Sequence, residues 1–535
     1  MPTLDWIGKK AVENHHKEVP YRLLKCVPEL SVGEPGSGNL LVQGDNLEAL
    51  KALLPYYGGK VKCIYIDPPY NTGDENWVYN DAVNSLEMRQ WLGEVVGRDD
   101  LSRHDKWLCM MYPRVALLRE FLTEDGAIFI SIDDNEVARM RLIIDDVFGI
   151  DSFAATFIWE KRTTRENRRI FSFSHDYVLC YAKSLRAFQE IRGTLPLTDA
   201  VRERYANPDD DSRGPWQSVS LNAQAGHGTP AQFYTITTPS GRRLDPPQGR
   251  CWSVTEERLK GLVAEKRIWF GAHGSNVPRL KKFLSETTRG LTPHTLWSAD
   301  EVGTTDSATK TLLEIFSGQS RFDTTPKPVE LIERVLRITT SPGDLILDSF
   351  AGSGTTGHAV LKLNQQDGGS RRFILVEMEP KIAREVTAER VKRVAQGYTN
   401  AKGEQVEGLG GGFRFCELGA TLFGADGSIR NEVKFADLAH HVFFTEMREP
   451  LPKKANGSTP LLGVANGTAV YLLYNGVLKD KDPKGGNVLT MEALKWLPGH
   501  EGPKVVYGTA CTLGERTLAR HGITFRQIPY EVKSS

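Results

Sequence analysis

A carboxylate, two prolines and a tyrosine follow an apolar run in the stretch IYIDPPYNTG, residues 64–73. Asp67 offers a carboxylate oxygen and Pro68 a backbone carbonyl oxygen, and each can accept an N–H hydrogen bond. Pro69 stiffens the turn because its ring fixes φ. Tyr70 offers an aromatic face on which a planar group can stack. The stretch is therefore suited to holding an amino group on an aromatic base.

An exocyclic amino group of a base is a poor nucleophile, since its lone pair is delocalised into the ring. If Asp67 and Pro68 each accept one of its hydrogens, the nitrogen is drawn towards tetrahedral geometry and its lone pair can point at a methyl donor. Such catalysis acts by positioning and electrostatic stabilisation. The base must first be lifted out of a duplex, and Tyr70 suits a base in that state. The motif predicts methylation of an amino nitrogen of a base.

The segment LILDSFAGSGTTGHA, residues 345–359, opens as an apolar strand and breaks into glycines before a helical pattern. Its glycines have G-x-G-x-x-G spacing: Gly352, Gly354 and Gly357. Glu377 follows after the next apolar run, where an acid suits the hydroxyls of a ribose. The lysine and hydroxyl residue of an NTPase phosphate loop are missing after the last glycine, which excludes that class, whereas the glycines alone leave NAD open. We expect a nucleotide-type cofactor at this loop.

Two kinds of apolar pattern surround these motifs. Short runs rich in β-branched and aromatic residues predict strands that are buried on both faces; they are 39–43, 61–66, 126–132, 155–159, 176–182, 345–350 and 373–377. Amphipathic patterns between them predict helices; they are 46–55, 112–124, 135–149, 328–338 and 358–364. The alternation of strands and helices predicts an α/β fold, a Rossmann-like, doubly wound sheet of about seven strands.

The composition is that of a large globular protein. The chain has 535 residues, of which 40% are hydrophobic and 25% charged, and it is too long for one ordinary domain. It contains no apolar run long enough to cross a membrane, and its N-terminus lacks the apolar core of a secretory signal, so we expect a cytoplasmic protein. The seven cysteines stand singly, which predicts reduced, mostly buried thiols. The histidine pairs at 15–16 and 440–441 lack further ligands at metal spacing, so we expect solvated side chains and no metal site.

The predicted sheet is interrupted between residues 184 and 320 by a stretch that is rich in Gly, Pro, Ser and Thr and has no strand–helix rhythm. We interpret it as an inserted domain, and the glycine cluster at 407–413 as a linker to a small α/β or α+β unit. The predicted organisation has five parts: an N-terminal arm (1–38), the catalytic half of the core (39–183), the insertion (184–320), the cofactor half of the core (321–400), and a linker with an accessory domain (401–535).

Positive charge must be concentrated locally, because 67 lysines and arginines balance 67 aspartates and glutamates. The run KRTTRENRR, residues 161–169, is one candidate, although a solvated face is the plainer explanation of a charge run. Within the insertion, basic and aromatic residues mix in short segments, as phosphate contacts and base readers require. The predicted nucleic-acid contacts are Lys161, Arg162, Arg165, Arg168, Arg242, Arg243 and Lys281.

The two motifs together resemble a known family. DSFAGSGTT is similar to the F-x-G-x-G signature of S-adenosylmethionine-dependent methyltransferases. With IDPPYNTG ahead of it, the order resembles the amino-methylating DNA methyltransferases whose catalytic motif precedes the cofactor motif. Further segments resemble the modification (Mod) subunit of type III restriction–modification systems; they are GDNLEAL (44–50), RHDKWLCMMYPR (103–114), SIDDNE (131–136), TTPKPVELIERV (324–335) and VEMEP (376–380).

The resemblance implies roles for individual residues. Asp67, Pro68, Pro69 and Tyr70 would form the catalytic motif. The residues implied for S-adenosylmethionine are Asp45, Asn46, Asp67, Lys327, Asp348, Phe350, Ala351, Gly352, Gly354, Thr355 and Glu377. Asp45 would bind the adenine amino group of the cofactor, although it stands where an aspartate commonly caps a helix. Lys327 would lie near the methionine end.

The resemblance also implies the substrate and the partners. In this family D-P-P-Y goes with adenine N6 in double-stranded DNA; N4 of cytosine, and N-methylation of RNA or protein, stay open as alternatives, as does a module that binds a nucleotide without catalysis. The insertion would be the target-recognition domain. Type III modification subunits pair, so a homodimer is expected. The chain has no translocase motif, so any restriction activity would need a separate subunit.

Overall fold

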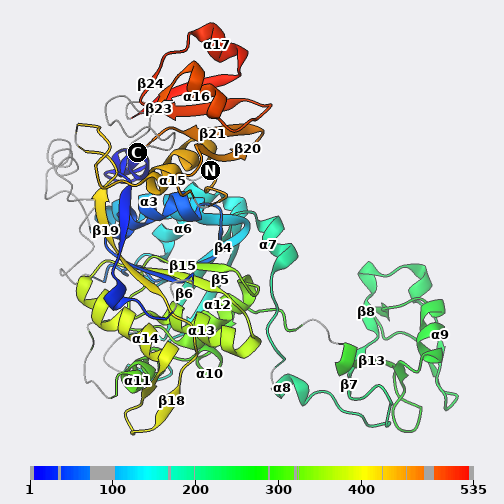
Figure 1. Ribbon diagram of the computed structural model, residues 1–535. Helices are drawn as coiled ribbons and strands as arrows, with labels where there is room; N and C mark the ends of the chain where they lie inside the picture. Colours follow the sequence, from blue (N-terminus) through cyan, green and yellow to red (C-terminus); the bar gives the residue numbers. More distant parts are fainter. Residues whose placement is uncertain are drawn as a thin grey trace. The chain divides into compact units, whose positions relative to one another are not determined.

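The computed structural model describes residues 5–33, 38–72, 103–166, 170–197, 199–286, 290–317, 322, 324–424, 426–453, 455–474 and 487–528 (Figure 1). The chain divides into two compact units. The first comprises Met1–Gly193 together with His294–Ser535, and the second comprises Thr194–Pro293.

The first unit is built on one large mixed sheet. Within the described ranges it has ten strands, in the order β1-β19-β2-β16-β15-β3-β4-β6-β5-β14. Their bounds, in that order, are Arg22–Cys26, Arg414–Thr421, Leu40–Gln43, Arg372–Glu377, Leu345–Asp348, Val61–Ile66, Leu122–Ile132, His175–Ala182, Phe153–Glu160 and Leu296–Trp297. The strands from β19 to β4 are mutually parallel, and β6 runs antiparallel to both of its neighbours.

Helices cover both faces of this sheet, which explains why its central strands are continuously apolar. Every residue of β3 and β15 is buried. Helices α3 (Asn46–Tyr57), α5 (Arg103–Phe121) and α6 (Val137–Phe148) pack in sequence against one another. Helices α12 (Val329–Thr339), α13 (Thr355–Asp367) and α14 (Glu389–Gln396) do the same, and Figure 1 shows the two groups on opposite sides of the sheet. The α/β, doubly wound fold is therefore confirmed.

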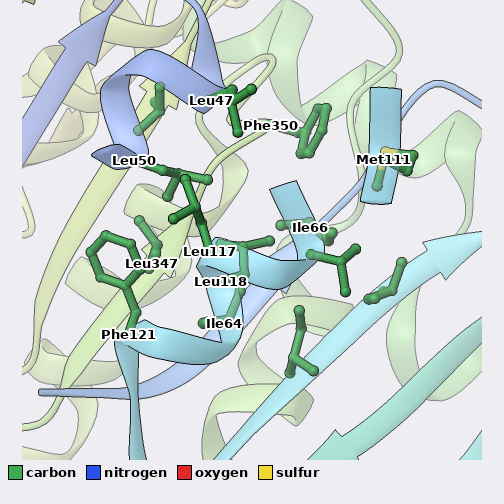
Figure 2. Packing of buried hydrophobic residues seen from close by; sticks show 14 of the residues in the cluster. Leu47, Leu50, Ile64, Ile66, Met111, Leu117, Leu118, Phe121, Leu347 and Phe350 are labelled. Atoms are coloured by element: carbon green, nitrogen blue, oxygen red, sulfur yellow. The ribbon is translucent and has the colours of Figure 1, made fainter. Parts of the chain in front are cut away.

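The core beneath the first group of helices fixes the strands that carry the two motifs. Figure 2 shows leucines of α3 and α5 packed with Ile64 and Ile66 of β3 and with Leu347 of β15, and all of these residues are at most 3% exposed. Burying a side chain of this size contributes about 1.5–3 kcal/mol. The ends of β3 and β15 are thus held by apolar packing immediately before the polar motifs begin.

Three of the predicted boundaries in this unit need correction. Residues 22–26 form β1, which pairs antiparallel with β19, so this part of the predicted N-terminal arm belongs to the main sheet. Strand β19 in turn pairs with β2, so the accessory domain begins beyond Thr421 and not at 401. With β14 at the other edge, these strands extend the sheet beyond the expected seven. The helix expected at 112–124 begins at Arg103 and ends at Phe121, because β4 begins at Leu122.

A smaller α/β layer completes the first unit at its C-terminal end. It has the strand order β20-β21-β23-β25, in which β21, β23 and β25 are parallel. The strands are Leu461–Ala465, Thr468–Leu472, Lys504–Gly508 and Ile523–Gln527, and the helices are α15 (Phe435–Met447), α16 (Met491–Trp496) and α17 (Glu515–Arg520). Tyr21 shares a buried cluster with this layer. His441 is buried against the Tyr21 ring with centroids 4.3 Å apart, and His440 is half-buried, with its pKa lowered to about 4 by desolvation, so the predicted solvated surface is wrong for this pair.

Short elements make up the rest of the first unit. The helices are α1 (Lys9–Val12), α2 (His15–Glu18), α7 (Leu185–Ile191), α10 (Ala299–Val302) and α11 (Thr305–Ile315), and the strands are β17 (Gly397–Thr399), β18 (Gln405–Glu407), β22 (Val488–Leu489) and β24 (Ala510–Cys511). In the part of the chain that the structure describes, no helix is long and apolar enough to cross a membrane. Five of the seven cysteines are buried, as predicted.

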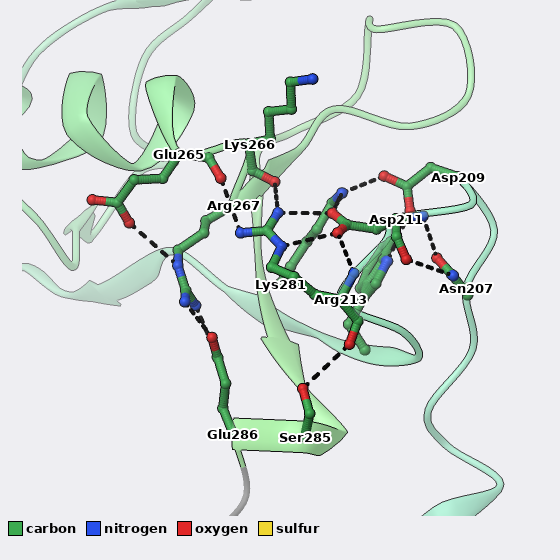
Figure 3. Close-up of polar contacts among 11 residues, drawn as sticks. Asn207, Asp209, Asp211, Arg213, Glu265, Lys266, Arg267, Lys281, Ser285 and Glu286 are labelled. Atoms are coloured by element: carbon green, nitrogen blue, oxygen red, sulfur yellow. Dashed lines mark hydrogen bonds and ion pairs between the residues drawn. The ribbon is translucent and has the colours of Figure 1, made fainter.

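The second unit is shorter than the predicted insertion of 184–320, because α7, β14, α10 and α11 belong to the first unit. It contains the sheet β12-β13-β7 (Ile268–Trp269, Arg279–Phe283, Trp216–Ser220) and the pairs β11-β8 (Arg250–Trp252, Asn222–Gln224) and β10-β9 (Arg243–Leu244, Ile236–Thr237). Its helices are α8 (Asp199–Arg202) and α9 (Glu256–Ala264). Figure 3 shows a polar network in which Lys281 bonds to Asp209 and Asp211.

Candidate active site

The two motifs leave neighbouring strands at the centre of the large sheet. Strands β15 and β3 are parallel and paired, with Ile346 opposite Cys63 and Leu347 opposite Ile64. From β3 the chain continues through α5 to β4 on one side, and from β15 it continues through α13 to β16 on the other. Where two crossovers diverge in this way, a crevice opens at the carboxyl ends of the strands. A cavity of about 540 Å³ lies there.

Most of the predicted site residues line this cavity. The motif contributes Asp67, Pro68, Pro69 and Tyr70. The residues predicted for the cofactor that line it are Asp67, Lys327, Asp348, Phe350, Ala351, Gly352, Thr355 and Glu377. Asp45, Asn46 and Gly354 do not line it. The fold therefore joins two sequence motifs in one cavity and leaves three of the predicted residues outside it.

The catalytic motif is tied down on both sides of its turn. Lys327 Nζ donates a hydrogen bond to Asp67 Oδ2 and lies 5.0 Å from the centre of the Tyr70 ring. The indole of Trp107, on α5, donates to the carbonyl oxygen of Pro69 at 2.7 Å. Because these bonds come from separate segments of the chain, the turn has little freedom to move.

Acceptors of the motif are left for a ligand. Among the described residues, no hydrogen bond of normal geometry reaches the buried Oδ1 of Asp67 or the hydroxyl of Tyr70, and no described residue donates to the Pro68 carbonyl. Burial, and next the negative charge of Asp67, raises the pKa of Tyr70 well above its usual value, so Tyr70 stays neutral. Buried polar atoms without partners are costly, which indicates that something else satisfies them.

Two buried carboxylates shape the glycine loop. Asp348 accepts hydrogen bonds from the Phe350 amide at 3.0 Å and from the Thr356 hydroxyl at 2.5 Å. Glu377 accepts from the amides of Gly352 at 2.8 Å and Glu379 at 3.0 Å. Burial nevertheless raises the pKa of each carboxyl to about 7, because desolvation outweighs these bonds. The loop thus holds two carboxylates at a cost in stability, as ligand-binding sites commonly do.

Glycines are required at two positions of the loop. Gly352 and Gly354 have φ of 49° and 77°, in the left-handed region that other residues rarely adopt. A Cβ at Gly354 would meet Thr387 at 3.2 Å, so this glycine also allows the loop to pack closely against the helical segment Ile382–Ala388. The buried Arg390 also holds the loop, since it donates to the hydroxyls of Ser353 at 2.9 Å and Thr355 at 2.8 Å.

Asp45 and Asn46 have structural partners. Asp45 caps α3 by accepting from the Glu48 amide at 2.9 Å, and Arg114 donates to its other oxygen at 2.7 Å. The fully buried Arg114 also donates to the Asn46 side chain, and Asn46 in turn donates to the Ser349 carbonyl at 3.3 Å. The capping alternative is thus present in the structure. Arg114 was missed by sequence reasoning, because nothing local distinguishes an arginine that is buried in a helix.

The remaining wall of the cavity comes from β5 and β6. Trp159 lines it and donates to the Gly303 carbonyl at 2.9 Å, so it is both a core residue and a cavity residue. Lys161 donates to Asp176 at 2.5 Å, and both line the cavity. Burial raises the pKa of Asp176, and Lys161 opposes that rise. Asp176 was not predicted, because a single acid at the start of a strand carries no motif.

The predicted DNA contacts divide into three groups. Arg162, Arg165, Arg242 and Arg243 are exposed. Lys161 and Lys281 are corrections: Lys161 is paired with the buried Asp176, and Lys281 is 4% exposed and bonded to Asp209 and Asp211, so neither charge is free. Arg168 lies outside the described residues.

The fold and the cavity define the class of protein. Residues 61–389 match the family model of the DNA methylases, which is more than half of the chain. The match begins at β3, ahead of the D-P-P-Y motif, and ends at the start of α14, beyond the glycine loop and Glu377. The chain therefore belongs to the DNA methylase family.

Particular relatives refine this assignment. The chain is 32% identical to the Mod subunit of the type III restriction–modification enzyme StyLTI from Salmonella typhimurium, over 73% of this chain and 62% of that protein. It is 28% identical to the EcoP15I Mod subunit from Escherichia coli, over 74% of this chain and 66% of that protein. It is 29% identical to the type II methyltransferase M.KpnI from Klebsiella pneumoniae, over 68% of this chain and 89% of that protein. The chain thus spans less than two thirds of the length of the Mod subunits that it matches.

Solved structures with a similar arrangement include a putative DNA modification methylase, TTHA0409, from Thermus thermophilus in complex with S-adenosyl-L-methionine. It is 16% identical, and the match covers 69% of this chain and 98% of that one with a TM-score of 0.30. The PvuII cytosine-N4-specific DNA methyltransferase is 14% identical, and the match covers 66% of this chain and 86% of that one with a TM-score of 0.32.

The raised pKa of Asp348 predicts a pH-dependent stability. An unfolded aspartate titrates near pH 3.9, whereas Asp348 in the fold titrates at about 7. Between these values the folded state binds a proton that the unfolded state has lost, so the contribution of Asp348 to stability falls as pH rises from about 4 to about 7. Asp348→Asn removes this dependence and keeps an acceptor oxygen for the Phe350 amide, while its amide nitrogen can donate to the Thr356 hydroxyl in place of the present bond. Thermal unfolding of the cofactor-free protein measures this. Between pH 5 and pH 8, the free energy of unfolding of the variant should rise by on the order of 1–3 kcal/mol relative to that of the unaltered chain. Parallel stability curves for the two proteins would contradict this.

Proposed function

We propose that the chain is a site-specific DNA methyltransferase that transfers a methyl group from S-adenosylmethionine to the exocyclic N6 of adenine in double-stranded DNA. One observation carries the proposal: the acceptors of the D-P-P-Y turn that no described residue satisfies and the glycine loop with Glu377 line one cavity. A nucleotide-binding module without catalysis would have no use for the free acceptors of Asp67 and Pro68.

The residues present fit the proposed cofactor. Glu377 offers a carboxylate to ribose hydroxyls at the end of β16, and Phe350 offers an apolar face next to it. The carboxylate of Asp67, which lines the same cavity, suits a cationic ammonium group at Oδ2, the oxygen that also accepts from Lys327. When bound, S-adenosylmethionine supplies an electrophilic methyl group on a sulfonium.

The residues of the chain itself would bind and orient the base. In the proposed reaction, Asp67 Oδ1 and the Pro68 carbonyl accept the two hydrogens of an amino group, which concentrates electron density on its nitrogen. The Tyr70 ring, kept neutral, can stack on a base that has left the duplex. Lys327 fixes the orientation of Asp67 through Oδ2 and leaves Oδ1 for the substrate. Catalysis would then come from preorganisation, without a covalent intermediate on the enzyme.

Adenine is favoured over cytosine by the first letter of the D-P-P-Y motif, and DNA over RNA or protein by the family. Sequencing for modified bases in DNA from cells that express the chain would identify the base, the recognised sequence and the methylated strand. Transfer of radiolabel from the cofactor, compared on DNA, RNA and protein, separates the remaining alternatives. Such a substrate places the protein in the cytoplasm.

The catalytic motif predicts a clear difference between two substitutions at one position. Tyr70→Ala removes the stacking surface and should lower the rate of methyl transfer by about 100-fold or more, as should Asp67→Ala, which removes an acceptor. Tyr70→Phe keeps the ring and loses only a hydroxyl without a hydrogen-bond partner among the described residues, so it should retain near-normal turnover. The rates are measured by tritium transfer to duplex DNA. Near-normal turnover by Asp67→Ala would overturn the assignment.

We propose that Thr194–Pro293 is the target-recognition domain and that its residues Arg242 and Arg243 contact the phosphates of DNA. Charge reversal at both should weaken binding to every sequence and lower the slope of log affinity against log salt by about one per lost contact. Arg186→Glu is the matched control, since Arg186 is 92% exposed but lies on α7 of the first unit, where no contact is predicted. Titrations of duplex DNA at several salt concentrations measure both quantities. Equal slopes for all three proteins would show that the two arginines are only solvated.

We further propose that the chain forms a homodimer and that a separate restriction subunit can join it. Each Mod relative is named as one subunit of a restriction–modification enzyme. Helix α16 exposes Trp496 by 72% and Met491 by 54%, and exposed apolar residues of this size commonly mark an interface. Reading a sequence while a base is held in a cavity also needs two distant surfaces, which a dimer provides.

Light scattering of the full chain should give twice the mass of one chain. Replacing Trp496 and Met491 by serine should favour the monomer, whereas Phe233→Ser, at a 49% exposed position of the second unit, should not. A chain ending near residue 410 is unsuitable for this test, because it would lose β19 from the main sheet. A full-length monomer with normal methylation would refute the dimer.

A further inference from the structure

Three polar side chains meet in the interior next to the catalytic turn. Asn71 directly follows Tyr70 and is 4% exposed, and its side-chain amide donates to Oε1 of Glu136, which is fully buried. His104 Nδ1 lies 2.5 Å from the same oxygen and 3.4 Å from the Asn71 amide nitrogen. A buried carboxylate is costly unless hydrogen bonds satisfy it. Two partners of the Glu136 carboxylate are Asn71, from the motif turn, and His104, from α5.

The backbone of Asn71 makes this contact specific. Its φ of 55° lies in the left-handed region, which asparagine and glycine adopt more readily than other residues. This conformation turns the chain away at the end of the motif, and the Asn71–Glu136 bond holds it there. An amide that donates to a carboxylate cannot be replaced by an isosteric carboxylate without repulsion.

Helix α5 supports the turn from two positions on one face. His104 and Trp107 are three residues apart, so they lie on the same side of the helix. Trp107 donates a hydrogen bond to the Pro69 carbonyl, and His104 contacts the oxygen of Glu136 that also accepts from Asn71. The last residues of the motif are therefore anchored on both sides of Tyr70. Oε2 of Glu136 is 3.4 Å from Arg139, which satisfies the other half of the carboxylate.

We propose that Asn71, Glu136 and His104 form a clamp that holds the D-P-P-Y turn in its reactive geometry. They are positioning residues, because they act on the substrate only through the turn. The proposal rests on the proposed methyl transfer. It gives a role to the segments RHDKW and SIDDNE, which contribute nothing directly to the cavity lining.

An exchange of acid and amide across the clamp tests it in the full-length protein. Asn71→Asp places two carboxylates together and should lower kcat for duplex DNA by about 100-fold, as displacement of a catalytic group does. Adding Glu136→Gln restores an amide opposite a carboxylate and should recover most of the rate. The Kd for S-adenosylmethionine, measured by calorimetry, should change little in either variant, since Glu377 and the glycine loop are untouched.

Two further variants keep the result decisive. Asn71→Gly retains the left-handed backbone but has no donor, so it should also lower kcat, and it replaces Asn71→Asp if that variant does not fold. Asn135→Asp is the matched control: it sets a carboxylate beside Asp133, 2.7 Å from the present amide, in the same segment but outside the clamp, and should leave kcat unchanged.

The outcomes separate the clamp from the proposed function. Folded Asn71→Asp with normal kcat, or a double variant no faster than the single one, would overturn the clamp. Absence of methyl transfer by the unaltered chain would contradict the proposed function instead. The clamp is then decided by the Tm values of the unaltered chain, Asn71→Asp, Glu136→Gln and the double variant, which should show that the two substitutions compensate each other.

Discussion

The pairing of β15 with β3 is the constraint on which the rest of the site depends. These strands come from distant parts of the sequence, and their parallel register sets Leu347 beside Ile64. Because the crossovers that follow them run to opposite sides, the polar segments after each strand cannot be covered by either helix layer. The ion pair between Lys327 and Asp67, 260 residues apart, then ties the cofactor half of the core to the catalytic half.

Apolar packing offsets the free-energy cost of the buried polar groups in the site. The carboxyls of Asp348 and Glu377 are desolvated, and Asp67 and Tyr70 keep buried atoms without partners in the described part of the chain. Each such group costs free energy that a ligand can recover. The fully buried β3 and β15 beneath them explain why the sheet tolerates this. Stability and ligand binding are thus divided between the interior and the ends of the same strands.

Several charges of the described residues are neutralised by buried or half-buried partners. Lys161, Lys281 and Arg114 each look free in the sequence, yet each is bonded to a buried or half-buried acid. A chain with no net charge can still bind DNA through the arginines that remain exposed, such as Arg242 and Arg243. The neutralised residues hold loops together instead, as Lys281 does in the second unit (Figure 3).

The sequence by itself determined seven strands of the main sheet, the class of fold and the two motifs, because these depend on local patterns. An apolar run such as VKCIYI, rich in β-branched residues, favours the buried strand that forms β3, and the prolines of D-P-P-Y favour a turn. Only the tertiary structure decided that residues 22–26 and 414–421 join the main sheet, since strand pairing depends on partners far along the chain. It also decided that Arg114 holds Asp45 and that Glu136 holds Asn71. Burial and pairing are properties of the assembled core, and no local pattern encodes which acid a buried base or amide will meet.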